Sequence, residues 1–166
     1  MNPGESTDHD KPAIGTESPM PIAIYLDNCS LHRPLDDRTQ PRINLEAEAV
    51  LSILTLCEGS KLRLVASDVL EYEANRNPDA EKRVLVGEVL ASARQIVSMS
   101  DSVKQRANVL VTRGFKALDA MHVACAEAAS VDYFCTCDDR LLSRIRLQSD
   151  VHIKAVTPLE LAEELL

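Results

Sequence analysis

The chain has 166 residues, of which 45% are hydrophobic and 3% aromatic, and its formal net charge at pH 7 is −8. This length and composition are typical of one globular domain, and they argue against a protein that coats nucleic acid through a basic surface or stacks bases on aromatic side chains. The negative charge does not exclude a nuclease, because acidic metal ligands contribute to it.

The first 20 residues are rich in Pro, Gly, Ser, Thr and Asp. We therefore expect a flexible tail over residues 1–20, with Met20 as an alternative start, and one folded domain over residues 21–166. The tail lacks the basic start and apolar centre of a secretory signal, and no apolar run approaches the roughly 20 residues of a membrane span. The five cysteines lie in apolar surroundings, which indicates reduced thiols. We expect a cytoplasmic protein without a membrane segment.

Strand-forming and helix-forming segments alternate after the tail. Short runs rich in Val, Ile and aromatic side chains predict strands at Ile22–Leu26, Leu62–Ala66, Val131–Cys137 and Val151–Val156. Apolar spacings of three and four predict helices at Ile43–Cys57, from Asp68 onward, and at Glu81–Val97, Ser102–Arg113, Leu118–Ala129, Asp138–Arg146 and Pro158–Leu165. Leu31–Arg42 is expected to be a polar connection. The alternation predicts an α/β fold with a central parallel sheet of roughly four to five strands, flanked by helices in a three-layer α/β/α arrangement.

Acidic side chains gather where the predicted strands end. They are Asp27 after the first strand, Glu71 and Glu73 after the second, Asp119 at the start of the helix before the third, and Asp138 and Asp139 after the third. Ligand sites of parallel α/β sheets lie beyond the carboxyl ends of the strands. Several carboxylates in one place repel one another unless a hard cation such as Mg²⁺ or Mn²⁺ lies among them. Such an ion polarises a phosphoryl group and lowers the pKa of bound water, so the pattern predicts metal-assisted phosphodiester hydrolysis.

Each acid also has a purely structural interpretation. Asp27 is compatible with a turn, Asp119 with a helix N-terminus and either Asp138 or Asp139 with a helix cap, whereas a glutamate on a helix is usually solvated. No single acid indicates a site. Their coincidence at successive strand ends does.

Four pieces of the sequence resemble the PIN domain, the metal-dependent ribonuclease fold of VapC-type toxins. They are IYLDN, ASDVLEYE, LDAMHVACA and TCDDRLL, and the resemblance extends from Ile22 to about Leu165. It implies a PIN-like fold with Asp27, Asp119 and Asp138 as metal ligands. It also implies a catalytic glutamate: the distance from Ser67 favours Glu73, and Glu71 is the alternative.

Other residues receive supporting roles from the resemblance or from their positions: Thr136, Ser67, Asn28 and Asp139, the last as a supporting or capping acid. Arg33 and Arg140 are candidates for contacts with substrate phosphates. His122 lies one turn after Asp119 and is expected to be a packed, hydrogen-bonded residue. The resemblance further implies that the helices Glu81–Val97 and Ser102–Arg113 form a clamp over the cleft.

The leading hypothesis is a Mg²⁺- or Mn²⁺-dependent endoribonuclease that is the toxin of a type II toxin–antitoxin pair. The resemblance implies an RNA substrate, a cognate antitoxin and a homodimer as partners. No base-reading motif indicates which RNA is cut. The alternative is a non-catalytic PIN-like module for protein interaction or regulation, which the acidic charge favours slightly. A phosphoacceptor domain would need a lysine partner on a later strand, and Lys154 is its only candidate.

Overall fold

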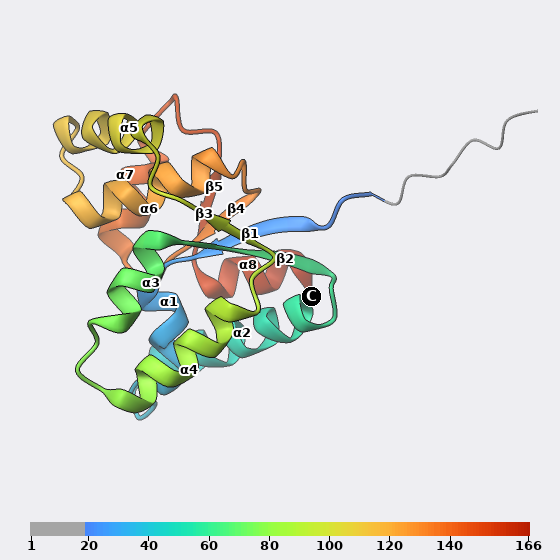
Figure 1. The fold of residues 1–166 in the computed structure, drawn as a ribbon. Helices are drawn as coiled ribbons and strands as arrows, with labels where there is room; N and C mark the ends of the chain where they lie inside the picture. Colours follow the sequence, from blue (N-terminus) through green and yellow to red (C-terminus); the bar gives the residue numbers. More distant parts are fainter. Residues whose placement is uncertain (1–18) are drawn as a thin grey trace, which may run out of the picture.

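Five parallel strands form the central sheet of residues 19–166, the part of the chain that the structure, a computed structural model, describes (Figure 1). In spatial order they are β3 (Gln95–Val97), β2 (Leu62–Ser67), β1 (Ile22–Leu26), β4 (Tyr133–Cys135) and β5 (Lys154–Val156). The predicted parallel sheet is therefore confirmed. The expected tail, residues 1–20, lies outside the described residues except for Pro19 and Met20.

Helices cover both faces of this sheet. On one side lie α2 (Pro41–Glu58), α4 (Ala80–Ala91) and α8 (Pro158–Leu165), and on the other lie α5 (Asp101–Thr112), α6 (Ala117–Ala128) and α7 (Asp139–Arg146) (Figure 1). At the end of the sheet where β1 finishes lie α1 (Asn28–His32), the 3₁₀ turn η1 (Arg33–Leu35) and α3 (Asp68–Asn75). The predicted three-layer arrangement is confirmed. No helix in residues 19–166 is long and apolar enough to cross a membrane.

The middle strand β1 is covered on both faces. Its Ile24, Tyr25 and Leu26 are fully buried, as expected for a parallel strand between two helix layers. The ring of Tyr25 stacks on that of Phe134 in the neighbouring β4, with 5.5 Å between the ring centroids. Because β1 and β4 pair side by side, the residues that follow them, Asp27 and Thr136, leave the sheet next to each other.

Two stretches differ from the sequence-based expectation. The predicted helix Glu81–Val97 ends at Ala91, and Gln95–Val97 forms the edge strand β3. The backbone amide of Arg94 donates to the carbonyl of Leu64, which draws the chain alongside β2. β-Branched residues at the end of a helical pattern favour this change. The predicted polar connection Leu31–Arg42 is partly helical, since it contains the end of α1, the whole of η1 and the first residues of α2.

The two helices expected to form a clamp also pack separately. α4 packs against α3 and α5 packs against α6, and Figure 1 shows them at opposite sides of the sheet. The strand β3 lies between them in the chain, and after it the chain continues into α5 on the other face of the sheet. Of these two helices only α4 contributes to the lining of a cavity at the carboxyl end of the sheet, through Lys82.

Candidate active site

A cavity of about 330 Å³ opens at the carboxyl ends of β1 and β4. From β1 the chain adds β2 and β3 on one side of the sheet and then β4 and β5 on the other. Open α/β sheets form ligand crevices at such a switch point, here between β1 and β4. Acids from separate stretches of the chain line the cavity: Asp27 after β1, Glu73 on α3, Asp119 in the first turn of α6 and Asp138 after β4. The structure thus brings together the four acids of the expected catalytic set.

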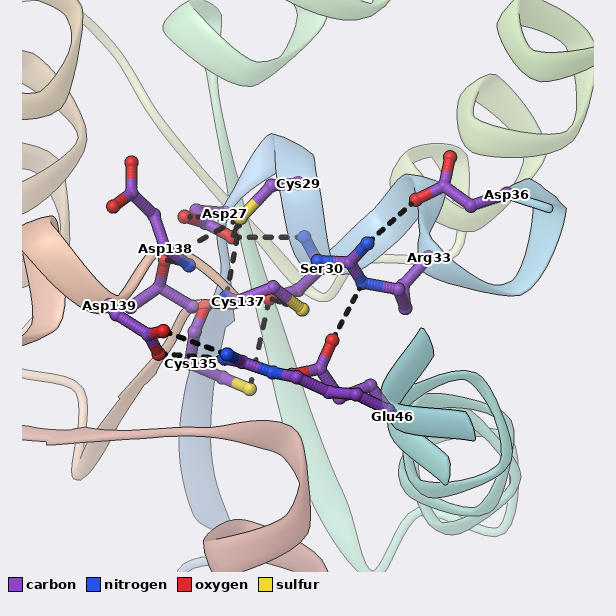
Figure 2. Close-up of polar contacts among 12 residues, drawn as sticks. Asp27, Cys29, Ser30, Arg33, Asp36, Glu46, Cys135, Cys137, Asp138 and Asp139 are labelled. Atoms are coloured by element: carbon purple, nitrogen blue, oxygen red, sulfur yellow. Dashed lines mark hydrogen bonds and ion pairs between the residues drawn. The ribbon is translucent and has the colours of Figure 1, made fainter. Parts of the chain in front are cut away.

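Asp27 is held in place by the first turn of α1. Its Oδ1 accepts the backbone amide of Ser30 at 3.0 Å, which caps the helix, and the Cys29 thiol donates to both carboxylate oxygens at 3.0 and 3.1 Å (Figure 2). The residue is 5% exposed. Asp27 thus caps α1 and lines the cavity at once, because the cap bond fixes the direction of its carboxylate.

Asp138 is fixed in the same way at the start of α7. Its Oδ1 accepts the amides of Arg140 at 2.8 Å and Leu141 at 3.1 Å, and its own amide donates to the buried Thr136 hydroxyl at 3.0 Å. Asp138 is thus the helix cap. The neighbouring Asp139 is exposed and forms a double hydrogen bond with Arg42, at 2.7 and 2.8 Å.

Asp119 experiences the charges of the other acids. Burial raises the pKa of its carboxyl group, and the negative charge of Asp138 and, more weakly, of Asp27 raises it further, whereas His122 and Lys116 lower it. Carboxylates this close together oppose one another's ionisation, and a bound cation would reduce this repulsion.

The structure separates the two candidate glutamates. Glu73 lines the cavity, and its Oε2 lies 2.5 Å from Nε2 of the buried His122. Glu71 is exposed and lies outside the cavity lining. Glu73 is therefore the glutamate that reaches the site, and α3 directs it there from its cap at Ser67, whose hydroxyl accepts the Leu70 amide at 3.2 Å.

The donor set fits a hard divalent cation. The cavity is lined by carboxylate oxygens, and the buried Oδ1 of Asn28 has no hydrogen-bond partner among the described residues. Hard cations prefer such oxygen donors. The cap bonds on Asp138 both use Oδ1 and leave its Oδ2 for another partner. As placed, no three His, Cys, Asp or Glu side chains in residues 19–166 form a ready-made metal site.

The two arginines expected near the substrate differ in their surroundings. Arg33 lines the cavity, but its guanidinium contacts the buried Glu46 at 2.9 Å and Asp36 at 3.1 Å (Figure 2). Arg140 is exposed and lies outside the cavity lining.

Several residues of the site were not expected from the sequence. Lys82 lines the cavity from α4 and contacts Asp36 at 2.9 Å, a position that only the packing of α4 against α3 provides. Cys29 lines the cavity beside Asp27, and all five cysteines are free. Tyr25 contacts His122 at 2.7 Å behind the site. The nearest sequence signal for Cys29 and Tyr25 is that each lies two residues from Asp27.

The comparison with models of protein families identifies the family of this chain. The sequence model of the PIN domain matches residues 24–147. PAE2754 from Pyrobaculum aerophilum has a similar structure, with a TM-score of 0.54 and 19% identity over 88% of this chain and 98% of that one. VapC20 of Mycobacterium tuberculosis, described as a sarcin-ricin loop cleaving toxin, gives a TM-score of 0.53 at 14% identity over 79% and 98% of the two chains.

VapBC2 from Rickettsia felis, bound to a DNA fragment from its promoter, gives a TM-score of 0.52 at 12% identity over 82% of this chain and 98% of that one. A search of curated protein sequences gives no match. At these identities the solved structures show a shared fold.

Proposed function

Because this chain belongs to the PIN domain family, we propose that it is a Mg²⁺- or Mn²⁺-dependent endoribonuclease and the toxin of a type II toxin–antitoxin pair. The observation that carries the proposal is the convergence of Asp27, Glu73, Asp119 and Asp138 on one cavity at the carboxyl ends of β1 and β4. Four acids from separate stretches in one small space are costly without a cation and useful with one.

In the proposed mechanism, Asp27, Asp119 and Asp138 hold the cation. When bound, the cation polarises the phosphoryl group and lowers the pKa of the attacking water. The caps of α1 and α7 keep the carboxylates of Asp27 and Asp138 turned toward the cavity, so little rearrangement is needed when the substrate enters. Glu73, whose Oε2 is held by His122, offers Oε1 as the acceptor for a water proton.

The cavity also has a positive side that suits a phosphodiester. Lys82 and Arg33 line it as well, and both contact Asp36, at 2.9 and 3.1 Å. We propose that Lys82 contacts substrate phosphates and that the exposed Arg140 steers RNA toward the cavity from outside. Phosphate contacts of this kind bind RNA without reading its sequence.

The similar proteins support the partners that we propose. One is described as a toxin that cleaves the sarcin-ricin loop and another as a VapBC complex. By analogy we propose an RNA substrate and a cognate antitoxin that covers the cavity. Homodimer formation and a cytoplasmic location remain predictions.

The test is an RNA cleavage assay with the purified full chain in Mg²⁺, in Mn²⁺ and in chelator. Wild type should cut RNA only with a divalent cation, and Asp27→Asn or Asp119→Asn should lose at least about 100-fold in rate, since each removes a ligand charge. Glu163→Gln, which changes an exposed acid of α8 outside the cavity, is the matched control and should cut like wild type. Cleavage that survives either Asn substitution unchanged would refute the nuclease proposal, and a wild type without activity would favour the non-catalytic module.

A further inference from the structure

A buried chain of hydrogen bonds lies behind Glu73. The Ser67 hydroxyl lies 2.7 Å from the Tyr25 hydroxyl, and this hydroxyl lies 2.7 Å from Nδ1 of His122. The other ring nitrogen, Nε2, lies 2.5 Å from Oε2 of Glu73. Ser67, Tyr25 and His122 are at most 3% exposed, so each polar atom of the chain depends on its neighbours in it.

The carboxylate at one end and a neutral imidazole together set the direction of every bond. An ionised Glu73 only accepts, so Nε2 of His122 must carry a proton and donate it. In a neutral imidazole Nδ1 is then bare and accepts the single proton of the Tyr25 hydroxyl. The Tyr25 oxygen in turn accepts from Ser67, whose oxygen already accepts the Leu70 amide at 3.2 Å. All the donors therefore point toward Glu73.

The chain also connects the elements that build the site. Tyr25 lies on β1 two residues before Asp27, and His122 lies on α6 one turn after Asp119. Ser67 ends β2 and caps α3, the helix that carries Glu73. The imidazole is further fixed by the edge of the Tyr25 ring, at 5.9 Å between centroids and an interplanar angle of 61°.

We propose that His122 is the positioning residue of the site: its Nε2–H tautomer, set by the Glu73 carboxylate and supported by the Tyr25 hydroxyl at Nδ1, holds Oε2 of Glu73 and leaves Oε1 to face the cavity. One partner of the imidazole is a carboxylate that lines the cavity, so the histidine connects the core to the site. The hold on Glu73 is a property of the folded chain alone. Its effect on cleavage rests on the proposed nuclease function.

The first test reads the tautomer directly. Nitrogen-15 NMR of the metal-free full chain should show a protonated Nε2 and a bare Nδ1 for His122. The exposed His152 is the internal control and should show averaged signals. Glu73→Ala removes the acceptor of the Nε2 proton, and it should move the His122 signals toward those of His152. A protonated Nδ1, or averaged signals in wild type, would overturn the proposal.

The second test is a double-mutant cycle on cleavage. His122→Phe should lower kcat about 10- to 100-fold with little change in KM, which is the usual effect of losing a partner that orients a site residue. In a Glu73→Ala background the same substitution should cost less than about 3-fold, because no carboxylate is left to hold. Equal losses in both backgrounds would overturn the positioning role.

Tyr25→Phe provides the same cycle if His122→Phe does not fold, since it changes one atom and preserves packing. If wild type does not cleave RNA, the proposed function fails, and the NMR tautomer still decides whether His122 holds Glu73.

Discussion

Arg33 provides the sharpest stability prediction, because this cavity-lining residue also forms an ion pair with a buried carboxylate. Its guanidinium contacts the carboxylate of Glu46 (Figure 2), at a distance of 2.9 Å. Glu46 is only 2% exposed. Among the residues that the structure describes, Glu46 has one further charged partner, Arg42, at 2.8 Å. Arg33→Met keeps the length of the side chain and removes the charge.

The magnitude follows from what remains on Glu46. Removing one partner of a buried ion pair costs about 3–5 kcal/mol when the other charge is left alone. Arg42 stays in contact with Glu46, but its side chain is 55% exposed and screened by solvent, so we expect a lower cost of about 2–3 kcal/mol. For a domain of this length, 1 kcal/mol shifts the melting temperature by about 2–4 °C. The loss should be about 4–12 °C.

Urea unfolding of the metal-free chain, followed by circular dichroism, measures this change. Arg140→Met is the matched control, because Arg140 is exposed, and it should change the free energy of unfolding by no more than about 0.5 kcal/mol. Combining Arg33→Met with Glu46→Leu should restore much of the loss, since no buried charge is left without its partner. Equal stability of Arg33→Met and wild type would refute the reasoning.

Three further predictions concern charge at the site and away from it. Burial and Asp138 raise the pKa of Asp119 in the folded chain, so ionisation of this carboxyl group lowers the stability as pH rises above the unfolded-state pKa. Asp119→Asn should therefore melt at a higher temperature than wild type at pH 7 without metal. A lower melting temperature would contradict this. Mn²⁺ at 100 times its dissociation constant should stabilise wild type by about 2.7 kcal/mol but not Asp119→Asn, measured by thermal melting with and without chelator. Arg113 and, more weakly, Arg106 lower the pKa of the exposed Asp150 to about 2. The stabilisation from the Asp150–Arg113 pair is therefore present above the ordinary pKa of 3.8 and is lost as pH falls through about 2. Asp150→Asn should therefore lower the melting temperature at pH 6 and leave it unchanged below pH 2, and the same loss at both pH values would argue against the pair.

Much of the site could be predicted because its signals are local. Asp27 and Asp138 each follow a strand directly and cap the next helix, so the same short stretch that ends the strand also aims the carboxylate. The carboxyl ends of parallel strands lie along one edge of the sheet. The convergence of the acids could therefore be predicted from their positions after successive strands.

The remaining features depend on long-range packing. Tyr25 and His122 are 97 residues apart in the chain, and nothing near either residue signals their contact. The pairing of Arg33 with the buried Glu46 requires α2 to lie beside η1, so the sequence alone indicated only an arginine near the cleft. The strand β3 continues a helical apolar pattern, and its pairing with the edge of β2 is a tertiary contact that the pattern alone does not show.

The central claim, that acids from separate stretches hold one catalytic cation, is tested most directly by the anomalous diffraction of a crystal of the full chain soaked in Mn²⁺. The proposal predicts a manganese peak in the cavity, within about 2.0–2.3 Å of carboxylate oxygens of Asp27, Asp119 and Asp138. A soaked crystal with no peak between these three side chains, or with manganese bound only elsewhere, would contradict it.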